Sequence, residues 1–217
     1  KDIGIVWDSP YKKILDTSNG IAWSKWFIQG KTNIYKSSVE KFSKTNPKKI
    51  AYYFESEDGI KSKITYSELD AKVSKFANAL KSLGVQKGDV IAIYLPMIQE
   101  AIISILAAAK IGAIQTVIFS GYSSESLCIR LRDCNAKFLI ASDGFSRKGK
   151  HVSQKETVDI AINTTDIEKV ILVSYKGVDS YVKSEKIIYL DKLLSTQNNI
   201  CDTEIVDSEH PLFILYT

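Results

Sequence analysis

Residues 87–150 decide the fold, with GDVIAIYLPM at 88–97, GAIQTVIFSGYS at 112–123 and AKFLIASDGFSRKGK at 136–150. Within this stretch, short apolar runs alternate with two segments of helical pattern. The runs are Val90–Leu95, Ile114–Phe119 and Phe138–Ala141. Continuous apolar strands separated by helix-length segments are typical of a parallel sheet covered by helices on both faces. We therefore expect an α/β fold, with a predominantly parallel sheet at its centre.

The segments after residue 150 extend the same pattern. They predict a helix over Ser153–Ile162, strands over Lys169–Val173 and Ile187–Leu190, a short helix starting at Asp191, and a loop over Ser195–Asp207. Pro211 suits the first position of a strand, and the continuously apolar Leu212–Tyr216 then predicts a further central strand. Because the carboxyl tip of a central strand normally leads into a functional loop, the sequence looks cut at its end.

The segment before residue 87 predicts two helices and a hairpin. The expected elements are a helix over Ile34–Lys44 capped by Asn33, a hairpin of Ile50–Phe54 and Ile64–Tyr66, and a helix capped by Ser67 and ended by Gly84. Asp58-Gly59 is a signal for a two-residue hairpin turn. Lys1–Asn33 shows no sustained period and is expected to be irregular, with its tryptophans, Trp7, Trp23 and Trp26, anchoring it by buried area.

The composition disfavours several classes of function. The 217 residues carry a net charge of +4, and 29 of them are lysine or arginine. Only Arg130, Arg132 and Arg147 are arginines, the side chain best suited to bases and phosphates, so a nucleic-acid platform is disfavoured. Three cysteines without a CxxC pair and two histidines offer little material for a zinc site or a catalytic triad. The cysteines are expected to be buried thiols of a reducing compartment. No signal peptide is recognisable, and no apolar run reaches the roughly 18 residues of a membrane helix.

Polar and glycine-containing loops follow the three central strands. In open α/β sheets, ligands bind beyond the carboxyl ends of the strands, so these loops predict a site at that edge. Ser120 and Gly121 lie in a turn before a helix capped by Ser123, and the backbone N–H groups of this turn could cradle an anion. The alternative is a commonplace strand-to-helix turn without a ligand. Residues 147–150, Arg-Lys-Gly-Lys, bring cations to the same edge, and Gly144 and Gly149 are expected to let this loop approach a ligand closely. The alternative for this loop is a solvated surface segment.

Five stretches of the chain resemble, in the same order, segments of one enzyme family. They are WFIQGKTN (26–33), KITYSELDAKVSKFANALKSLGVQKGDVIAIYLPMIQE (63–100), GAIQTVIFSGYSSESL (112–127), ASDGFSRKGK (141–150) and HPLFILYT (210–217). Together they are similar to the acetyl-CoA synthetase branch of the AMP-forming acyl-CoA synthetases, in the adenylate-forming superfamily. In that family LFILYT leads into a phosphate loop, SGTTGKPKG, whereas this sequence stops at Thr217. It departs from the family pattern at Gln29, Thr32 and Ser120.

The resemblance implies a ligase that activates acetate, or a similar short-chain acid, with ATP and Mg²⁺ and transfers the acyl group to CoA. The implied CoA-binding residues are Arg147, Lys148, Gly149, Lys150, Gly121 and Ser120, and Thr217 is implied at ATP. No catalytic residue or metal ligand of the family falls within the chain, so the chain alone is expected to be an inactive N-terminal fragment. We expect an extension and first helix in residues 1–45 and an incomplete α/β subdomain of the AMP-binding domain in residues 46–217. The expected protein is cytoplasmic, without nucleic-acid or membrane partners.

A free-standing, non-catalytic module that binds CoA or a nucleotide on the basic loop is the alternative interpretation. The sequence encoded after Thr217 discriminates between the two. A continuing SGTTGKPKG loop favours the enzyme, and a stop codon favours the module. Acetate is the expected acid, with propionate or a hydroxyacid next. The residues that shape the family's acyl pocket lie downstream of this segment, so the segment itself does not select among these acids.

Overall fold

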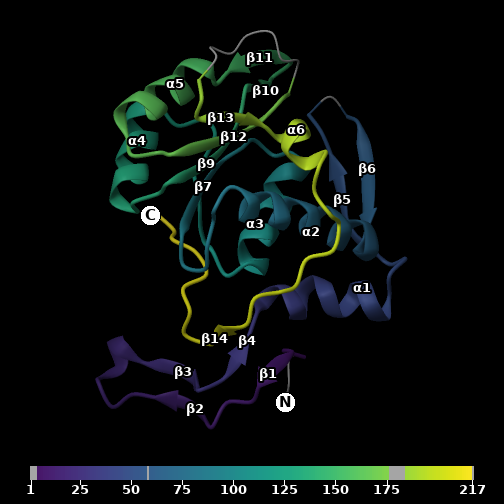
Figure 1. The fold of residues 1–217 in the computed structure, drawn as a ribbon, viewed down its shortest axis with the longest axis vertical. Helices are drawn as coiled ribbons and strands as arrows, with labels where there is room; N and C mark the ends of the chain where they lie inside the picture. The colour runs from purple at the N-terminus through teal and green to yellow at the C-terminus, as the bar shows by residue number, and fades with distance from the viewer. Residues whose placement is uncertain (1–3, 58, 176–183, 217) are drawn as a thin grey trace.

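The computed structural model describes residues 4–57, 59–175 and 184–216. At its centre lies a five-stranded sheet in the order β13-β12-β9-β7-β8 (Figure 1). Every pairing in this sheet is parallel. The strands are β7 (Val90–Tyr94), β8 (Ile114–Val117), β9 (Phe138–Ser142), β12 (Lys169–Val173) and β13 (Ile187–Tyr189). The predicted α/β fold with a parallel sheet is confirmed.

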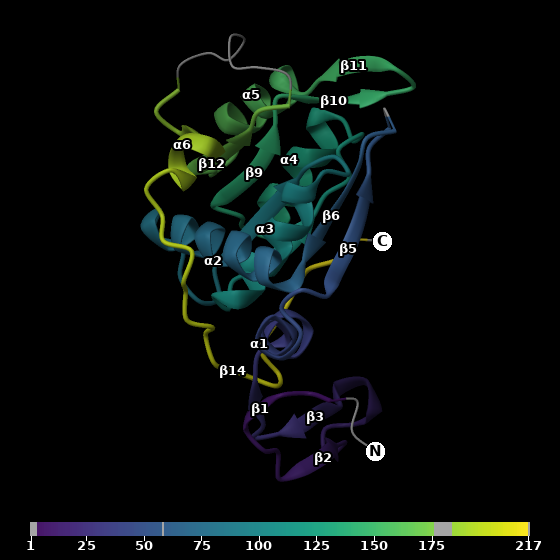
Figure 2. The same ribbon diagram turned by 90° about the vertical axis from the view of Figure 1, so that its right-hand side faces the viewer.

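Helices cover both faces of the sheet (Figures 1 and 2). One face carries α2 (Tyr66–Ser82), α3 (Gln99–Lys110) and α6 (Leu190–Leu194), and the other carries α4 (Ser124–Asp133) and α5 (Lys155–Thr164). Along β7, Ile91 and Ile93 are buried in the core that also contains residues of α2, α3 and α6. Ala92 and Tyr94 are buried in the core that contains residues of α4 and α5. Because successive side chains of a strand point to opposite faces, burial on both faces requires the continuous apolar run seen in the sequence.

Helix α2 begins at a capping box. Thr65 Oγ1 accepts a hydrogen bond from the backbone N–H of Glu68 at 3.3 Å, and the Glu68 carboxylate accepts one from the Thr65 N–H at 2.8 Å. The expected cap, Ser67, is wrong, because the helix already starts at Tyr66. At the other end, Gly84 has a φ of 90°, a left-handed conformation that ends the helix as predicted.

A short helix and a hairpin precede α2. Residues 34–45 are helical, with a π-helical stretch η2 (Lys36–Glu40) followed by α1 (Lys41–Thr45), and Asn33 Oδ1 caps them by accepting the Tyr35 N–H at 2.9 Å. The predicted hairpin is present as β5 (Ile50–Glu55) and β6 (Lys61–Thr65). β5 ends at Glu55 and β6 begins at Lys61, and these two residues pair with each other, so the two strands are more than two residues apart in the chain. The expected turn at Asp58-Gly59 includes Asp58, which lies outside the described residues.

The N-terminal segment is more regular than its sequence suggests. It holds β1 (Trp7–Ser9), β2 (Lys13–Asp16), a 3₁₀ turn η1 (Ile21–Trp23), β3 (Lys25–Ile28) and β4 (Lys31–Thr32). β4 also pairs with β14 (Val206–Asp207), which joins the first and last parts of the chain (Figure 1). The expectation of tryptophan anchors is confirmed only for Trp7, whose ring contacts Tyr11 and Phe27. Trp23 and Trp26 are 74% and 50% exposed.

The predicted central strand at residues 212–216 is wrong in the described structure. This segment lies beside β8 and forms one isolated parallel bridge, between Gln115 and Phe213. The Gln115 N–H donates to Leu212 O at 3.2 Å, and the Ile214 N–H donates to Gln115 O at 2.9 Å. Because it has a neighbour on one side within the described chain, Phe213 and Leu215 remain exposed despite their apolar character.

Candidate functional site

A cleft of about 590 Å³ lies beyond the carboxyl ends of the central strands. Pro96 follows β7 into its wall, and Phe119 and Ser120 follow β8. The opposite walls come from the tip of the β5–β6 hairpin and from the segment after β9, which contribute Glu57 and Arg147. This is the edge of the sheet at which α/β proteins bind ligands. The cleft therefore lies at the edge of the sheet where the sequence predicts a ligand site.

The basic segment after β9 is a β-hairpin, not the loop expected from the sequence. β10 (Gly144–Arg147) pairs antiparallel with β11 (Lys150–Ser153) (Figure 2). In this pairing Arg147 stands opposite Lys150. Lys148 and Gly149 form the two-residue turn, with φ values of 51° and 71°. Two successive positive φ angles are the mark of a type I′ turn. Lys-Gly is a weak signal for this turn compared with Asn-Gly, which explains why the hairpin was not predicted.

The two glycines of this hairpin have different tasks. Gly149 supplies the positive φ of the turn, and a Cβ there would meet open space. At Gly144 a Cβ would lie 2.5 Å from both the His151 ring and Val152 O. The structure gives Gly144 a packing role, because its missing side chain lets the two strands of the hairpin lie close together.

A buried polar network holds the base of the hairpin. The Gln154 side chain donates from Nε2 to Ser120 O at 3.2 Å and accepts from the Ser142 hydroxyl. Its backbone N–H donates to Asp143 O at 3.0 Å. The Asp143 carboxylate accepts the Tyr175 N–H at 2.7 Å. Sequence reasoning missed Gln154, which no motif signals, and passed over Asp143, although a polar residue directly after a buried strand was a usable signal.

The turn after β8 packs tightly. A Cβ on Gly121 would lie 2.5 Å from Cε1 of Phe119, so the ring occupies the space that a side chain would need. Ser120 is buried and lines the cleft. Ser123 caps α4 as predicted, accepting the Ser126 N–H at 3.3 Å. The turn thus brings a helix N-terminus, which favours anions, to the same edge of the sheet.

The predicted site residues fall into three groups. Ser120 and Arg147 line the cleft. Lys148, Gly149 and Lys150 form the exposed turn and the first residue of β11, next to Arg147. Gly121 packs against a neighbouring ring, and Thr217 lies outside the described residues. Clustered cations on an exposed hairpin beside a cleft can bind phosphate groups through charge and hydrogen bonds.

Comparison with known proteins assigns the family. The family model described as AMP-binding enzyme matches residues 39–217, most of the chain. The chain belongs to this family. Acetyl-coenzyme A synthetase of Methanothrix thermoacetophila is 45% identical over 97% of this chain, and that of Methylobacillus flagellatus is 41% identical over 98%. The structure also resembles acetoacetyl-CoA synthetase from Streptomyces lividans, with a TM-score of 0.87 and 25% identity over 98% of this chain. The chain spans about a third of the length of these relatives, 32% or 33%.

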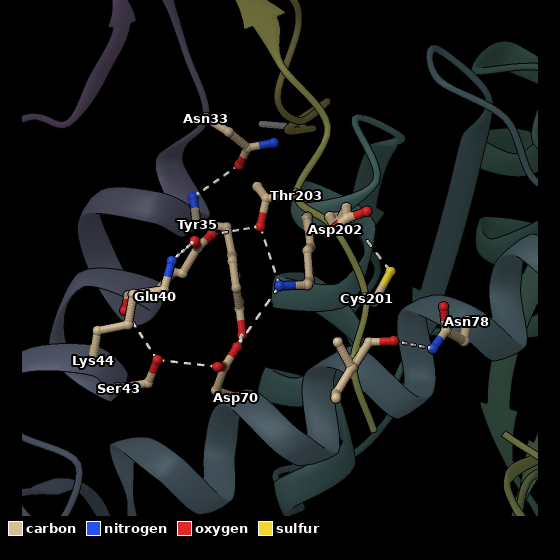
Figure 3. Close-up of polar contacts among 12 residues, drawn as sticks. Asn33, Tyr35, Glu40, Ser43, Lys44, Asp70, Asn78, Cys201, Asp202 and Thr203 are labelled. Carbon is tan, nitrogen blue, oxygen red and sulfur yellow. Dashed lines mark hydrogen bonds and ion pairs between the residues drawn. The ribbon is translucent and has the colours of Figure 1, made fainter. Parts of the chain in front are cut away.

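A second polar cluster lies at the end of α3 (Figure 3), and its residues are not among those that line the cleft. Lys110 is only 2% exposed, and its Nζ lies 3.7 Å from Asp70 Oδ1 and 3.1 Å from Thr203 Oγ1. The same carboxylate accepts the Tyr35 hydroxyl at 2.6 Å and the Ser43 hydroxyl at 3.0 Å. Burial lowers the pKa of Lys110 below its ordinary value, although Asp70 opposes this. Because these polar groups are paired, the cluster is typical of a structural network.

Three other features concern the part of the chain that the structure describes. Among residues 4–57, 59–175 and 184–216, no group of three or more His, Cys, Asp or Glu is arranged to hold a metal ion. No helix within those ranges has the length and apolar character of a membrane span. Cys128 and Cys134 are buried free thiols, as expected, whereas Cys201 is partly exposed.

Proposed function

We propose that the chain is the N-terminal part of an AMP-forming acyl-CoA synthetase. The enzyme activates acetate, or a similar short-chain acid, with ATP to an acyl-adenylate, releases pyrophosphate, and transfers the acyl group to CoA. The observation that carries the proposal is the 45% identity to an acetyl-coenzyme A synthetase across 97% of the chain. The cationic hairpin beside the cleft supports it independently, because phosphates are the ligands such a surface favours.

Within this proposal, the basic hairpin binds the phosphate groups of CoA. CoA supplies the thiol that receives the acyl group. Arg147 offers a planar fork for phosphate oxygens at the wall of the cleft, and Lys150, opposite it, adds a mobile point charge. Ser120, Gly121, Lys148 and Gly149 complete the proposed contact surface. These residues bind and orient CoA and take no part in bond making.

ATP and Mg²⁺ belong to the adenylation step of the proposed enzyme. Thr217, implied at ATP, lies outside the described residues. The described residues offer no cluster suited to a metal ion, so we assign no role toward Mg²⁺ to them. We infer a cytoplasmic enzyme in which residues 1–45 form an extension and residues 46–217 the first part of the AMP-binding domain. Residues 1–217 alone are expected to be inactive.

Acetate-dependent exchange of labelled pyrophosphate into ATP tests the proposal. The full-length protein that contains this chain should catalyse exchange with acetate, ATP and Mg²⁺, and should form acetyl-CoA when CoA is added. Residues 1–217 alone serve as the control and should show background exchange only. Absence of exchange by the full-length protein with acetate, propionate and other short-chain acids, or exchange by residues 1–217 alone, would contradict the proposal.

A further inference from the structure

The tip of the β5–β6 hairpin contacts the basic turn through one side chain. Glu57 Oε1 accepts a hydrogen bond from the backbone N–H of Lys148, a residue 91 positions away in the sequence. Figure 2 shows the β5–β6 hairpin rising toward the β10–β11 hairpin. Glu57 and Arg147 line the same cleft, so this contact joins two of its walls.

The geometry of the turn explains why Lys148 needs an outside acceptor. In a two-residue hairpin turn, the residues that flank the turn pair with each other, as Arg147 and Lys150 do here. The N–H of the first turn residue then has no partner within the hairpin. A carboxylate is a strong acceptor for it, because hydrogen bonds to an ionised group are about twice as strong as neutral ones.

The charges of the turn also favour a carboxylate beside it. Arg147, Lys148 and Lys150 place three cations within four residues, and like charges directly opposite each other destabilise a strand pair. A carboxylate at the tip of this turn offsets part of that repulsion. The hairpin also forms a two-stranded sheet of its own, and isolated hairpins are marginally stable. Its direction therefore depends on contacts from outside, at its base through Gln154 and at its tip through Glu57.

We propose that Glu57 is a positioning residue for the phosphate site of the basic hairpin. It holds the Lys148–Gly149 turn, and so directs the Arg147 fork along the cleft, without itself contacting the ligand. The inference rests on the proposed function, since CoA is the phosphate ligand tested. A competing role, in which the Glu57 carboxylate occupies the place of a phosphate, predicts the opposite result, because removing such a competitor would tighten CoA binding.

Calorimetric titration of the full-length protein with CoA tests the inference. Glu57→Ala should weaken CoA binding about tenfold, the scale of one lost charge-assisted contact. Glu57→Gln, whose amide oxygen can still accept the Lys148 N–H, should stay within about threefold of the unaltered protein. Pyrophosphate exchange should be unchanged in both variants. Glu168→Ala is the matched control. Glu168 is an exposed carboxylate that forms an ion pair with Lys137. It lies just before β12, at the amino ends of the parallel strands, whereas the cleft lies beyond their carboxyl ends.

A double-mutant cycle separates positioning from general destabilisation. If Glu57 acts through Arg147, the losses caused by Glu57→Ala and Arg147→Ala should be clearly less than additive. Additive losses, or CoA binding by Glu57→Ala that is unchanged or tighter, would overturn the inference. Amide hydrogen exchange at Lys148 without ligand gives a second readout, expected to be faster in Glu57→Ala and unchanged in Glu168→Ala. If the unaltered protein fails to bind CoA, the proposed function fails, and equal Lys148 exchange in Glu57→Ala and the unaltered protein would still overturn the Glu57 contact.

Discussion

The ammonium of Lys110 is a buried charge whose stability depends on its partners. It lies 4.2 Å from the centre of the Tyr35 ring and within ion-pair distance of Asp70. Lys110→Ala leaves the Asp70 carboxylate without its cation and should lower the free energy of unfolding by about 3 kcal/mol. Lys110→Met keeps the apolar stem over the ring and should lose about half as much. Urea denaturation measures both.

Lys137→Ala is the matched control for Lys110. Its partner is Glu168, at 3.3 Å, and both side chains are more than half exposed. Exposed ion pairs contribute little, so this variant should stay within about 0.5 kcal/mol of the unaltered protein. Equal losses in Lys110→Ala and Lys137→Ala would contradict the structural role assigned to the buried cluster.

The hydroxyl of Tyr35 predicts a weakening of the fold at alkaline pH. Burial, together with the hydrogen bond to Asp70, raises the pKa of Tyr35 well above its ordinary value of 10.0. Above about pH 10 the unfolded state releases this proton while the folded state retains it, so the unfolded state binds fewer protons and the free energy of unfolding falls. Tyr35→Phe should flatten this decline between about pH 9.5 and 11, as measured by denaturation at each pH. An identical decline in the variant would show that Tyr35 does not cause it.

At the scale of the element, the capping box of α2 gives a direct test of the corrected helix boundary. Thr65→Ala removes the side chain that accepts the Glu68 N–H, and should cost about 1 kcal/mol of stability. Ser67→Ala, at the position expected from the sequence to be the cap, should be nearly neutral, because Ser67 is exposed and lies within the helix. Thermal unfolding compares the two. A larger loss of stability for Ser67→Ala than for Thr65→Ala would contradict the capping role of Thr65 and favour Ser67 as the cap.

Most central elements could be predicted because local pattern and burial agree. β12 matches its predicted bounds, since all of its side chains after Lys169 are buried on the two faces of the sheet. The predictions that are wrong concern segments whose structure depends on which other segment of the chain they pair with. The Lys148-Gly149 turn has little local signal, and the strand expected after Pro211 makes a single bridge beside β8. A sequence shows that a segment is apolar but not how many neighbours it pairs with.

At the scale of the whole molecule, the sheet edge that carries the candidate site could be predicted, but its construction could not. Parallel strands bring their following loops to one edge, which places Ser120 and Arg147 at one cleft. No sequence motif marks Glu57 or Gln154 as part of the site, and only the tertiary contact of two hairpins brings Glu57 to Lys148. The N-terminal pairing of β4 with β14 was equally beyond local pattern, since its residues lie at opposite ends of the chain.

The central claim is that the basic hairpin binds the phosphate end of CoA, and the KM for CoA against that for dephospho-CoA tests it most directly. In the full-length enzyme, Arg147→Ala should raise the KM for CoA roughly tenfold to a hundredfold, the scale of a lost hydrogen bond to a charged group. The KM for dephospho-CoA, which lacks the 3′-phosphate, should change much less, and acetate-dependent pyrophosphate exchange should stay the same. Equal losses with both substrates, or a loss of exchange, would contradict the account.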